Sequence, residues 1–279
     1  MDIKIPQNSP IETDAYKMRA LVLEREAYQS REAGQIEKAF AAYDEAGNIY
    51  AKLGDHLKAS FCYSAAATCW NIHTGWQPLS QAASRNHLAA REAMKSKQYD
   101  YARSLFREAA LLYEKEGDSE NYSDCFIGSQ HAGRNRAWEL WTGAGTASSF
   151  AAEANASVDM NLKPRIQNFF RWLFNILNDA VWGYGEKPLR TLVVLAIIIF
   201  GCAIVYSFSG HIISAGGERH ISFLEAIYFS TITFTTVGFG DFLPGHWTRF
   251  LAAAEALSGI TLVPLFVVGL TRRYLRMYR

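Results

Sequence analysis

Two long apolar stretches near the C-terminal end limit the fold of this chain more than any other feature. Residues 192–208 contain no charged side chain, and residues 250–270 contain a single ionisable one, Glu255. With Thr191 added, the first stretch extends on the order of 27 Å as a helix, which is close to the hydrocarbon thickness of a bilayer. We therefore predict two transmembrane helices, at residues 191–208 and 250–270.

The charged residues are distributed unevenly although their total is balanced. The chain has 28 basic and 27 acidic residues, and this near-neutral total predicts neither a nucleic-acid partner nor an acidic tail. Residues 1–165 are rich in charge and alanine, whereas residues 189–270 are mostly apolar, which predicts a soluble domain joined to a membrane domain. The predicted parts are a soluble domain at 1–141, a linker at 142–162, an amphipathic helix at 163–185 and a membrane domain at 186–279.

The residues around the spans predict their orientation. The first ten residues contain no apolar run, so we expect no secretory signal peptide and a soluble domain in the cytoplasm. Most basic residues near the spans lie outside the hairpin that they form: Lys187, Arg190, Arg272, Arg273, Arg276 and Arg279, against Arg219 and Arg249 between the spans. By the positive-inside rule, both termini are predicted to be cytoplasmic, in a multi-pass protein of the cell membrane.

The soluble domain contains an internal repeat. Residues 39–62 match residues 102–125 after a shift of 63 positions, with nine identities in 24 positions. Each copy predicts a helix, a Gly-Asp turn and a second helix, and a further helix is predicted at 79–95. Helical hairpins repeated in this way are typical of an α-solenoid, so the predicted fold class of the whole chain is all-α.

This repeat resembles the tetratricopeptide type, particularly the variety in soluble NSF attachment proteins, over roughly residues 14–140. The resemblance rests on the pattern of helices and not on an invariant signature. It implies a concave face that binds a peptide or protein partner. The alternative is that the repeat is a structural cap or an assembly module.

An apolar, largely aromatic stripe marks the helix predicted at 163–185. Its residues recur at helical spacing, and most basic and amide side chains point away from them. The stripe consists of Ile166, Phe169, Phe170, Leu173, Phe174, Leu177 and Val181. With Trp172, Trp182 and Tyr184 close by, it predicts a helix that lies in the membrane interface. The alternative is a helix that packs on the core of the soluble domain.

The loop between the spans is apolar where an ordinary outer loop would be polar. Residues 222–235 predict a short pore helix, with Ser222 as N-cap and Glu225 at the third helical position. This helix is too short to cross a bilayer, so we expect it to enter the membrane and return. Non-helical backbone at that depth is tolerated only where it is buried in protein or lines a water-filled path.

The residues that follow the short helix, 236–241, are Thr-Val-Gly-Phe-Gly-Asp. Here the chain resembles the potassium channel family, whose filter is Thr-Val-Gly-Tyr-Gly or Thr-Val-Gly-Phe-Gly, usually followed by Asp; the resemblance covers residues 163–279. A dehydrated potassium ion needs oxygen ligands in place of water, and backbone carbonyls supply them if successive residues turn them toward one axis. An extended strand turns successive carbonyls in opposite directions, so some positions need backbone angles that glycine adopts readily. Gly238 and Gly240 meet that need.

The resemblance implies the ion sites and the assembly of the protein. The ion-binding residues would be Thr236, Val237, Gly238 and Phe239, through their carbonyls and the Thr236 hydroxyl, with Gly240 completing the filter and the Val237 side chain packed behind it. One pore loop per chain implies a homotetramer in a lipid bilayer. Potassium is then the permeant ligand, and no cofactor is implied.

Residues near the filter depart from the family pattern. Phe239 replaces the more common Tyr and lacks the hydroxyl that ties the filter to its surroundings. In bacterial relatives a pore-helix Glu pairs with the Asp after the filter, whereas this chain has Ile232 at that position. Asp241 is left with Tyr228 as its expected partner. We expect altered filter stability and inactivation, with selectivity retained.

Three residues of the second span are candidates for support or gating. Glu255 is ionisable inside a membrane helix, and we expect it to face the pore helix and bond its threonines; the alternative is that it lines the ion path. Gly259 lies where family members bend this helix, and Pro264 removes a backbone donor further along. Each is a hinge candidate, and the alternative is that both serve packing only.

The predicted function is therefore a potassium-selective channel subunit. No helix carries Arg at every third position, so no voltage sensor is expected, and we expect the N-terminal solenoid to gate or modulate the pore. One alternative is a membrane-anchored interaction scaffold with an incidental or closed pore, and another is a cation channel of low selectivity. No enzyme is predicted, because the chain has no nucleophile motif, metal cluster or phosphate loop. The four cysteines are expected to be free thiols.

Overall fold

The structure is a computed structural model that describes residues 10–72, 78–143, 162–214 and 217–277. The chain forms two compact units, Met1–Ile176 and Leu177–Arg279. The described residues are helical apart from three short strands, loops and turns, which confirms the all-α prediction. Nearly all of the linker predicted at 142–162 lies outside the described residues.

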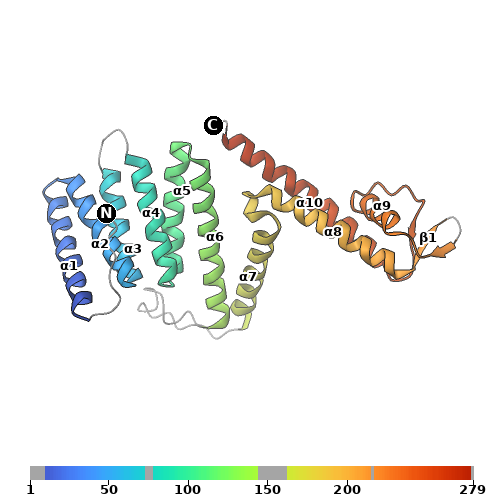
Figure 1. Cartoon of the computed structure of the whole chain (residues 1–279), viewed down its shortest axis with the longest axis horizontal. Helices are drawn as coiled ribbons and strands as arrows, with labels where there is room; N and C mark the ends of the chain where they lie inside the picture. The colour runs from blue at the N-terminus through green and yellow to red at the C-terminus, as the bar shows by residue number, and fades with distance from the viewer. Residues whose placement is uncertain (1–9, 73–77, 144–161, 215–216, 278–279) are drawn as a thin grey trace. The chain divides into compact units, whose positions relative to one another are not determined.

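Six helices in the first unit form what we call the helical array. Each helix packs against the next one along the chain, as Figure 1 shows for the blue to green segments. The helices are α1 (Pro10–Glu32), α2 (Ile36–Leu53), α3 (His56–Ile72), α4 (Pro78–Lys95), α5 (Tyr99–Glu116) and α6 (Ser119–Thr142). This consecutive packing is the arrangement of a helical repeat.

The spacing of 63 residues found in the sequence recurs in the helix bounds. Adding 63 to both ends of α2 gives the ends of α5, and α6 begins 63 residues after α3. The ends of α1 and α4, Glu32 and Lys95, are also 63 residues apart. The repeating unit therefore includes a third helix before the hairpin, which the sequence comparison did not detect.

The Gly-Asp pairs end one helix and begin the next. Gly54 and Gly117 have positive φ, 79° and 77°, and their N–H groups close the last turns of α2 and α5. This left-handed backbone is open to glycine without steric penalty. Asp118 then accepts a hydrogen bond from the Asn121 N–H at 3.0 Å, and Asp55 accepts one from the Lys58 N–H at 3.2 Å. The N–H bond of the glycine and the side-chain bond of the aspartate therefore fix the position of each turn of the repeat.

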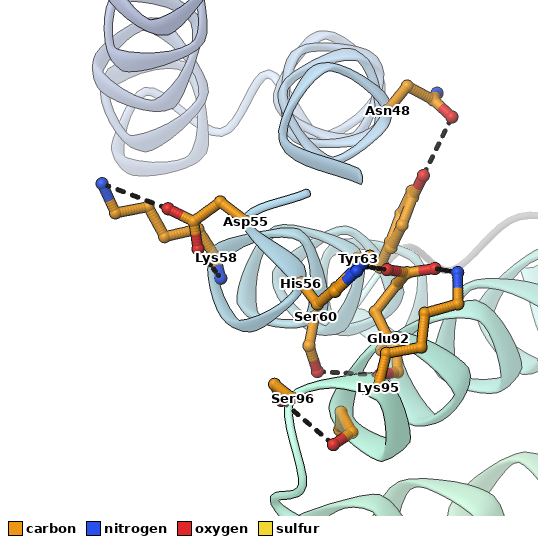
Figure 2. Close-up of polar contacts among 11 residues, drawn as sticks. Asn48, Asp55, His56, Lys58, Ser60, Tyr63, Glu92, Lys95 and Ser96 are labelled. Carbon is orange, nitrogen blue, oxygen red and sulfur yellow. Dashed lines mark hydrogen bonds and ion pairs between the residues drawn. The ribbon is translucent and has the colours of Figure 1, made fainter. Parts of the chain in front are cut away.

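Alanine forms much of the core of the array. Ten fully buried residues of its main cluster are alanines, among them Ala46 and its repeat partner Ala109, and large rings such as Tyr50 fill the remaining space. Figure 2 shows the polar contacts between α3 and α4: Ser60 donates to the Ala89 carbonyl at 2.8 Å, and Glu92 contacts His56 Nδ1 at 2.6 Å. Small side chains let these helices approach closely, and the polar contacts fix their register.

The helix α7 (Leu162–Trp182) lies in the first unit as far as Ile176. Its Trp172 ring lies 4.7 Å from the ring of Trp138 and 6.3 Å from that of Trp141, both on α6. Phe169 also contacts Trp141, at 5.1 Å between ring centroids. We call these four rings the aromatic cluster. Contacts of this kind add stability beyond the apolar area that they bury.

The residues of the predicted apolar stripe of α7 therefore lie on two different sides of the helix. Phe169 faces the array, whereas Ile166, Phe170 and Phe174 are 49%, 61% and 67% exposed. The alternative made from the sequence, packing on the first domain, holds for one side of this helix, and its place in a membrane interface stays a prediction. One side packs on α6 within the first unit, and the other is an apolar surface left uncovered in the single chain.

The second unit contains the two predicted spans. Its elements after α7 are η3 (Gly183–Gly185), α8 (Pro188–Ser209), β1 (Ile212–Ser214), β2 (Gly217–Arg219), α9 (Phe223–Phe234), β3 (Leu243–Pro244) and α10 (Thr248–Met277). By length and composition, α8 and α10 are two helices able to cross a membrane, and most of their surface is exposed in the single chain. The predicted spans 191–208 and 250–270 lie within them.

A small antiparallel sheet in the order β2-β1-β3 was not predicted. Ile212 pairs with Arg219 on one side and with Pro244 on the other. The Gly245 N–H donates to the His211 carbonyl at 2.8 Å, which continues this connection. Strands of two or three residues are too short to show alternating hydrophobicity, so only the structure reveals them. The sheet ties the segment after α8 to the segment before α10.

Candidate functional site

The helix α9 begins with the capping box that the sequence predicts. The Ser222 side chain accepts from the Glu225 N–H at 3.3 Å, and the Glu225 carboxylate accepts from the Ser222 N–H at 2.8 Å. These bonds satisfy two backbone donors at the start of the helix. With twelve residues, α9 is too short to span a bilayer and packs against both α8 and α10.

The loop after α9 alternates in backbone conformation. Thr236, Gly238 and Gly240 have φ of 59°, 54° and 83°, whereas Val237 and Phe239 do not have positive φ. The sequence analysis required such angles at the two glycines but did not foresee one at Thr236. A left-handed backbone costs a residue with a Cβ about 1–2 kcal/mol, so the fold around Thr236 must hold it there.

Backbone hydrogen bonds fix the start of this loop to α9. The Val237 N–H donates to the Ile232 carbonyl at 2.9 Å, and the Gly238 N–H reaches the same oxygen at 3.3 Å. The Thr236 N–H donates to the Thr233 carbonyl at 3.0 Å. The position of the loop therefore depends on the last turn of α9.

Glu255 on α10 connects that helix to α8 and α9. Its side chain is buried at 2% exposure, and its carboxyl group accepts a hydrogen bond from the Tyr206 hydroxyl of α8 at 2.7 Å. The other carboxyl oxygen contacts the Ser230 hydroxyl of α9. Glu255 thus faces α9, and its partners are a serine and a tyrosine, not the threonines suggested by the sequence. A buried carboxyl group needs such partners, because burying it alone is strongly unfavourable.

Gly259 lies where α10 touches the end of α9. A Cβ on Gly259 would overlap the backbone carbonyl of Phe234, so no larger residue fits without a shift of one helix. Pro264 lies inside α10, which continues through it without interruption. For Gly259, close packing is a sufficient reason for the glycine, whether or not the helix also bends there.

Tyr228 and Ile232, two residues of α9 near the loop, lie in different environments. The Tyr228 hydroxyl lies near the Asp241 carboxylate, which is the partner named from the sequence. Ile232 is 7% exposed and belongs to an apolar cluster with Tyr206, Phe229 and other residues of α8 and α9. Its side chain therefore packs in the core of the unit, whereas its carbonyl holds the loop.

Several apolar residues of this region are uncovered in the single chain. Val237, expected to pack behind the loop, is 55% exposed, and Phe239 is 71% exposed. Leu257 and Ile260 of α10 are 66% and 61% exposed. Large apolar surfaces of this kind mark contacts with lipid or with further protein.

The link between α7 and α8 is a tight corner packed against α10. Tyr184 has a φ of 58° in η3, and the Thr191 hydroxyl donates to the Val181 carbonyl at 3.2 Å. A Cβ on Gly269 of α10 would lie 3.6 Å from the Gly185 carbonyl oxygen. The corner after α7 is therefore in close contact with the C-terminal half of α10.

Comparison with known proteins finds a family that is similar to part of this unit. Residues 192–276 match the family described as "Ion channel". This part of the chain is similar to the ion channel family. The matched ion-channel segment contains α9, the loop at 236–241 and nearly all of both apolar helices, and it places the protein in a membrane.

The curated relatives that match are potassium channels by name. "Two pore potassium channel a" of Oryza sativa subsp. japonica is 37% identical over 82 residues, covering 29% of this chain and 24% of the relative. "Potassium channel subfamily K member 2" of Homo sapiens is 36% identical over 67 residues, covering 23% of this chain and 15% of the relative. The chain thus spans a quarter or less of the length of these two proteins. No solved structure matches it.

No metal-ligating cluster accompanies the ion-channel segment in the described part of the chain. Among residues 10–72, 78–143, 162–214 and 217–277, no group of three or more His, Cys, Asp or Glu side chains is placed to hold a metal ion. Cys62, Cys69 and Cys125 are buried free thiols in the array. Burial and the nearby Glu24 carboxylate raise the pKa of Cys62, which keeps this thiol neutral at physiological pH.

The close contact at Gly259 leads to a testable difference between two glycines of α10. Gly259→Ala should lower the stability of the folded protein by about 1–3 kcal/mol or more, because the new methyl group meets backbone. Gly269→Ala is the matched control, since its Cβ would make ordinary contacts at 3.6 Å. The measurement is thermal unfolding of both purified variants by circular dichroism. Equal unfolding temperatures would contradict the packing role and favour a hinge.

Proposed function

We propose that this protein is the subunit of a potassium-selective channel in which four chains form one pore. The observation that carries the proposal is the loop at 236–241, with its alternating backbone conformation, between two helices able to cross a membrane. The names of the curated relatives support potassium as the ion. Both termini are proposed to lie in the cytoplasm.

The backbone of the loop supports its role as an ion filter. Alternation of positive and negative φ turns the carbonyls of neighbouring residues toward one side, which an extended strand cannot do. The carbonyls of Thr236, Val237, Gly238 and Phe239 then replace the water around a potassium ion. Gly238 and Gly240 adopt these angles without penalty, and bonds to the Thr233 and Ile232 carbonyls hold Thr236 and Val237 in place.

The uncovered apolar residues support assembly from several chains. One loop offers carbonyl groups on one side of an ion only, so a closed ring of oxygens requires further copies. Val237 and Phe239 are exposed in the single chain and would be covered by neighbouring subunits. Glu255, buried and bonded to α8 and α9, holds the pore helix in this scheme and does not line the ion path.

Ion flux through the purified protein tests the proposed function. In liposomes loaded with potassium or sodium, we expect potassium efflux that exceeds sodium efflux and is blocked by barium. Gly238→Asp should abolish this efflux, because Gly238 has a φ of 54° and a side chain there is strained and charged. Equal permeation of both ions would contradict a selective filter. A folded oligomer that shows no efflux without ligand, or none after deletion of residues 1–160, would favour the alternative of a membrane-anchored interaction scaffold.

We also propose that the helical array modulates the pore through α7. The aromatic cluster joins α6 to the first part of α7, and the corner after α7 contacts α10 at Gly269. The exposed side of α7, with Phe170 and Phe174, suits the membrane interface. A change in the array would therefore reach the C-terminal half of α10 through a single helix.

This route predicts an effect on gating without an effect on selectivity. Trp172→Ala removes the central ring of the aromatic cluster and should change the open probability of single channels in a planar bilayer. The potassium-to-sodium permeability ratio should stay the same, because the filter loop is unaltered. Deletion of residues 1–160 serves as the reference for complete uncoupling. An open probability unchanged by either alteration, under every condition tried, would contradict gating by the array.

A further inference from the structure

A polar hollow of about 310 Å³ lies between α5, α6 and α7, and all of its lining residues belong to the first unit. Each helix contributes one arginine to its wall: Arg103 from α5, Arg136 from α6 and Arg171 from α7. Neutral amide groups, including Gln130 and Asn168, and the Asp100 carboxylate complete the polar lining. Three guanidinium groups around one small hollow indicate a site for an anion.

The three arginines are not equally paired. Arg136 forms ion pairs with Asp100 at 3.0 Å and with Glu139 at 3.5 Å, so its charge is balanced within the protein. In contrast, Arg103 and Arg171 form no ion pair with any described residue. The Nε atom of Arg103 is buried and has no hydrogen-bond partner among the described residues. A buried, unpaired donor of this kind costs free energy that a bound acceptor would recover.

The electrostatic surroundings of Arg103 also favour a bound anion. Burial is the largest cause that lowers the pKa of its guanidinium, and the positive charges of Arg107 and Arg171 lower it further, against the opposing effect of Asp100. A lowered pKa means that the charged form is disfavoured where it stands. An anion between Arg103 and Arg171 would reverse this penalty and give each guanidinium a partner.

We propose that this hollow binds a phosphate group, with Arg103 and Arg171 as its main ligands and Arg136 in support. Guanidinium groups bind phosphate oxygens through paired N–H donors, and the volume suits a small phosphate compound or the headgroup of an anionic lipid. The phosphate would link α7 to the array beside the aromatic cluster. This inference concerns binding only and holds whether or not the protein conducts ions.

Binding of defined phosphate probes to the full chain tests this proposal. In an uncharged detergent, isothermal titration calorimetry with sodium pyrophosphate and with inorganic phosphate detects a soluble ligand. Sedimentation with phosphatidylcholine vesicles, with and without phosphatidic acid, detects a lipid headgroup. We expect saturable binding in at least one arm, and the arm that gives it identifies the source of the phosphate.

Four substitutions make the test specific to this hollow. Arg103→Gln and Arg171→Gln should each weaken binding about tenfold or more, because each removes a charge-assisted contact. Arg91→Gln, at an exposed arginine of α4, is the control and should leave binding unchanged. Asp100→Asn should strengthen binding, because it removes the carboxylate that competes for Arg136.

The substitutions also define the results that would overturn the proposal. Absence of saturable binding in both arms, or binding that Arg103→Gln and Arg171→Gln leave unchanged, would do so. A loss caused equally by Arg91→Gln would show attraction to general positive charge and would also overturn it. Arg171 is exposed on α7, so its substitution tests the site even if Arg103→Gln reduces folding.

Discussion

The short helix α9 is held from behind by a buried carboxyl group, and the geometry of the ion-channel segment depends on that contact. Glu255 on α10 bonds Tyr206 of α8 and contacts Ser230 of α9, so one side chain fixes three helices. One turn further, Gly259 lets α10 reach the backbone of Phe234. The loop at 236–241 is bonded to the end of α9 through the Ile232 carbonyl. A shift of α9 would therefore move the loop that is proposed to bind potassium.

Local signals allowed much of this arrangement to be predicted from the sequence. The capping box at Ser222 and the Gly-Asp turns of the array depend on residues that are one to three positions apart, so the sequence displays them directly. The two apolar helices were equally visible, because their length and composition suffice. The repeat was found from identities, and its helix bounds then follow the same spacing.

Contacts between distant residues were not predictable in this way. The sequence around Ser230 does not indicate its contact with Glu255, because the two residues are 25 positions apart. The positive φ of Thr236 follows from bonds at the end of α9, and a threonine by itself does not indicate it. The stripe of α7 was found, but its division between the array and an exposed side required the positions of Trp138 and Trp141.

The central claim is that the carbonyls of residues 236–239 from four chains surround one column of ions. The most direct measurement is a structure of the purified protein with thallium, which replaces potassium and scatters X-rays anomalously. The account predicts anomalous peaks in a line on a fourfold axis, each surrounded by carbonyl oxygens of these residues. Absence of a fourfold axis, or thallium bound away from residues 236–239, would contradict it.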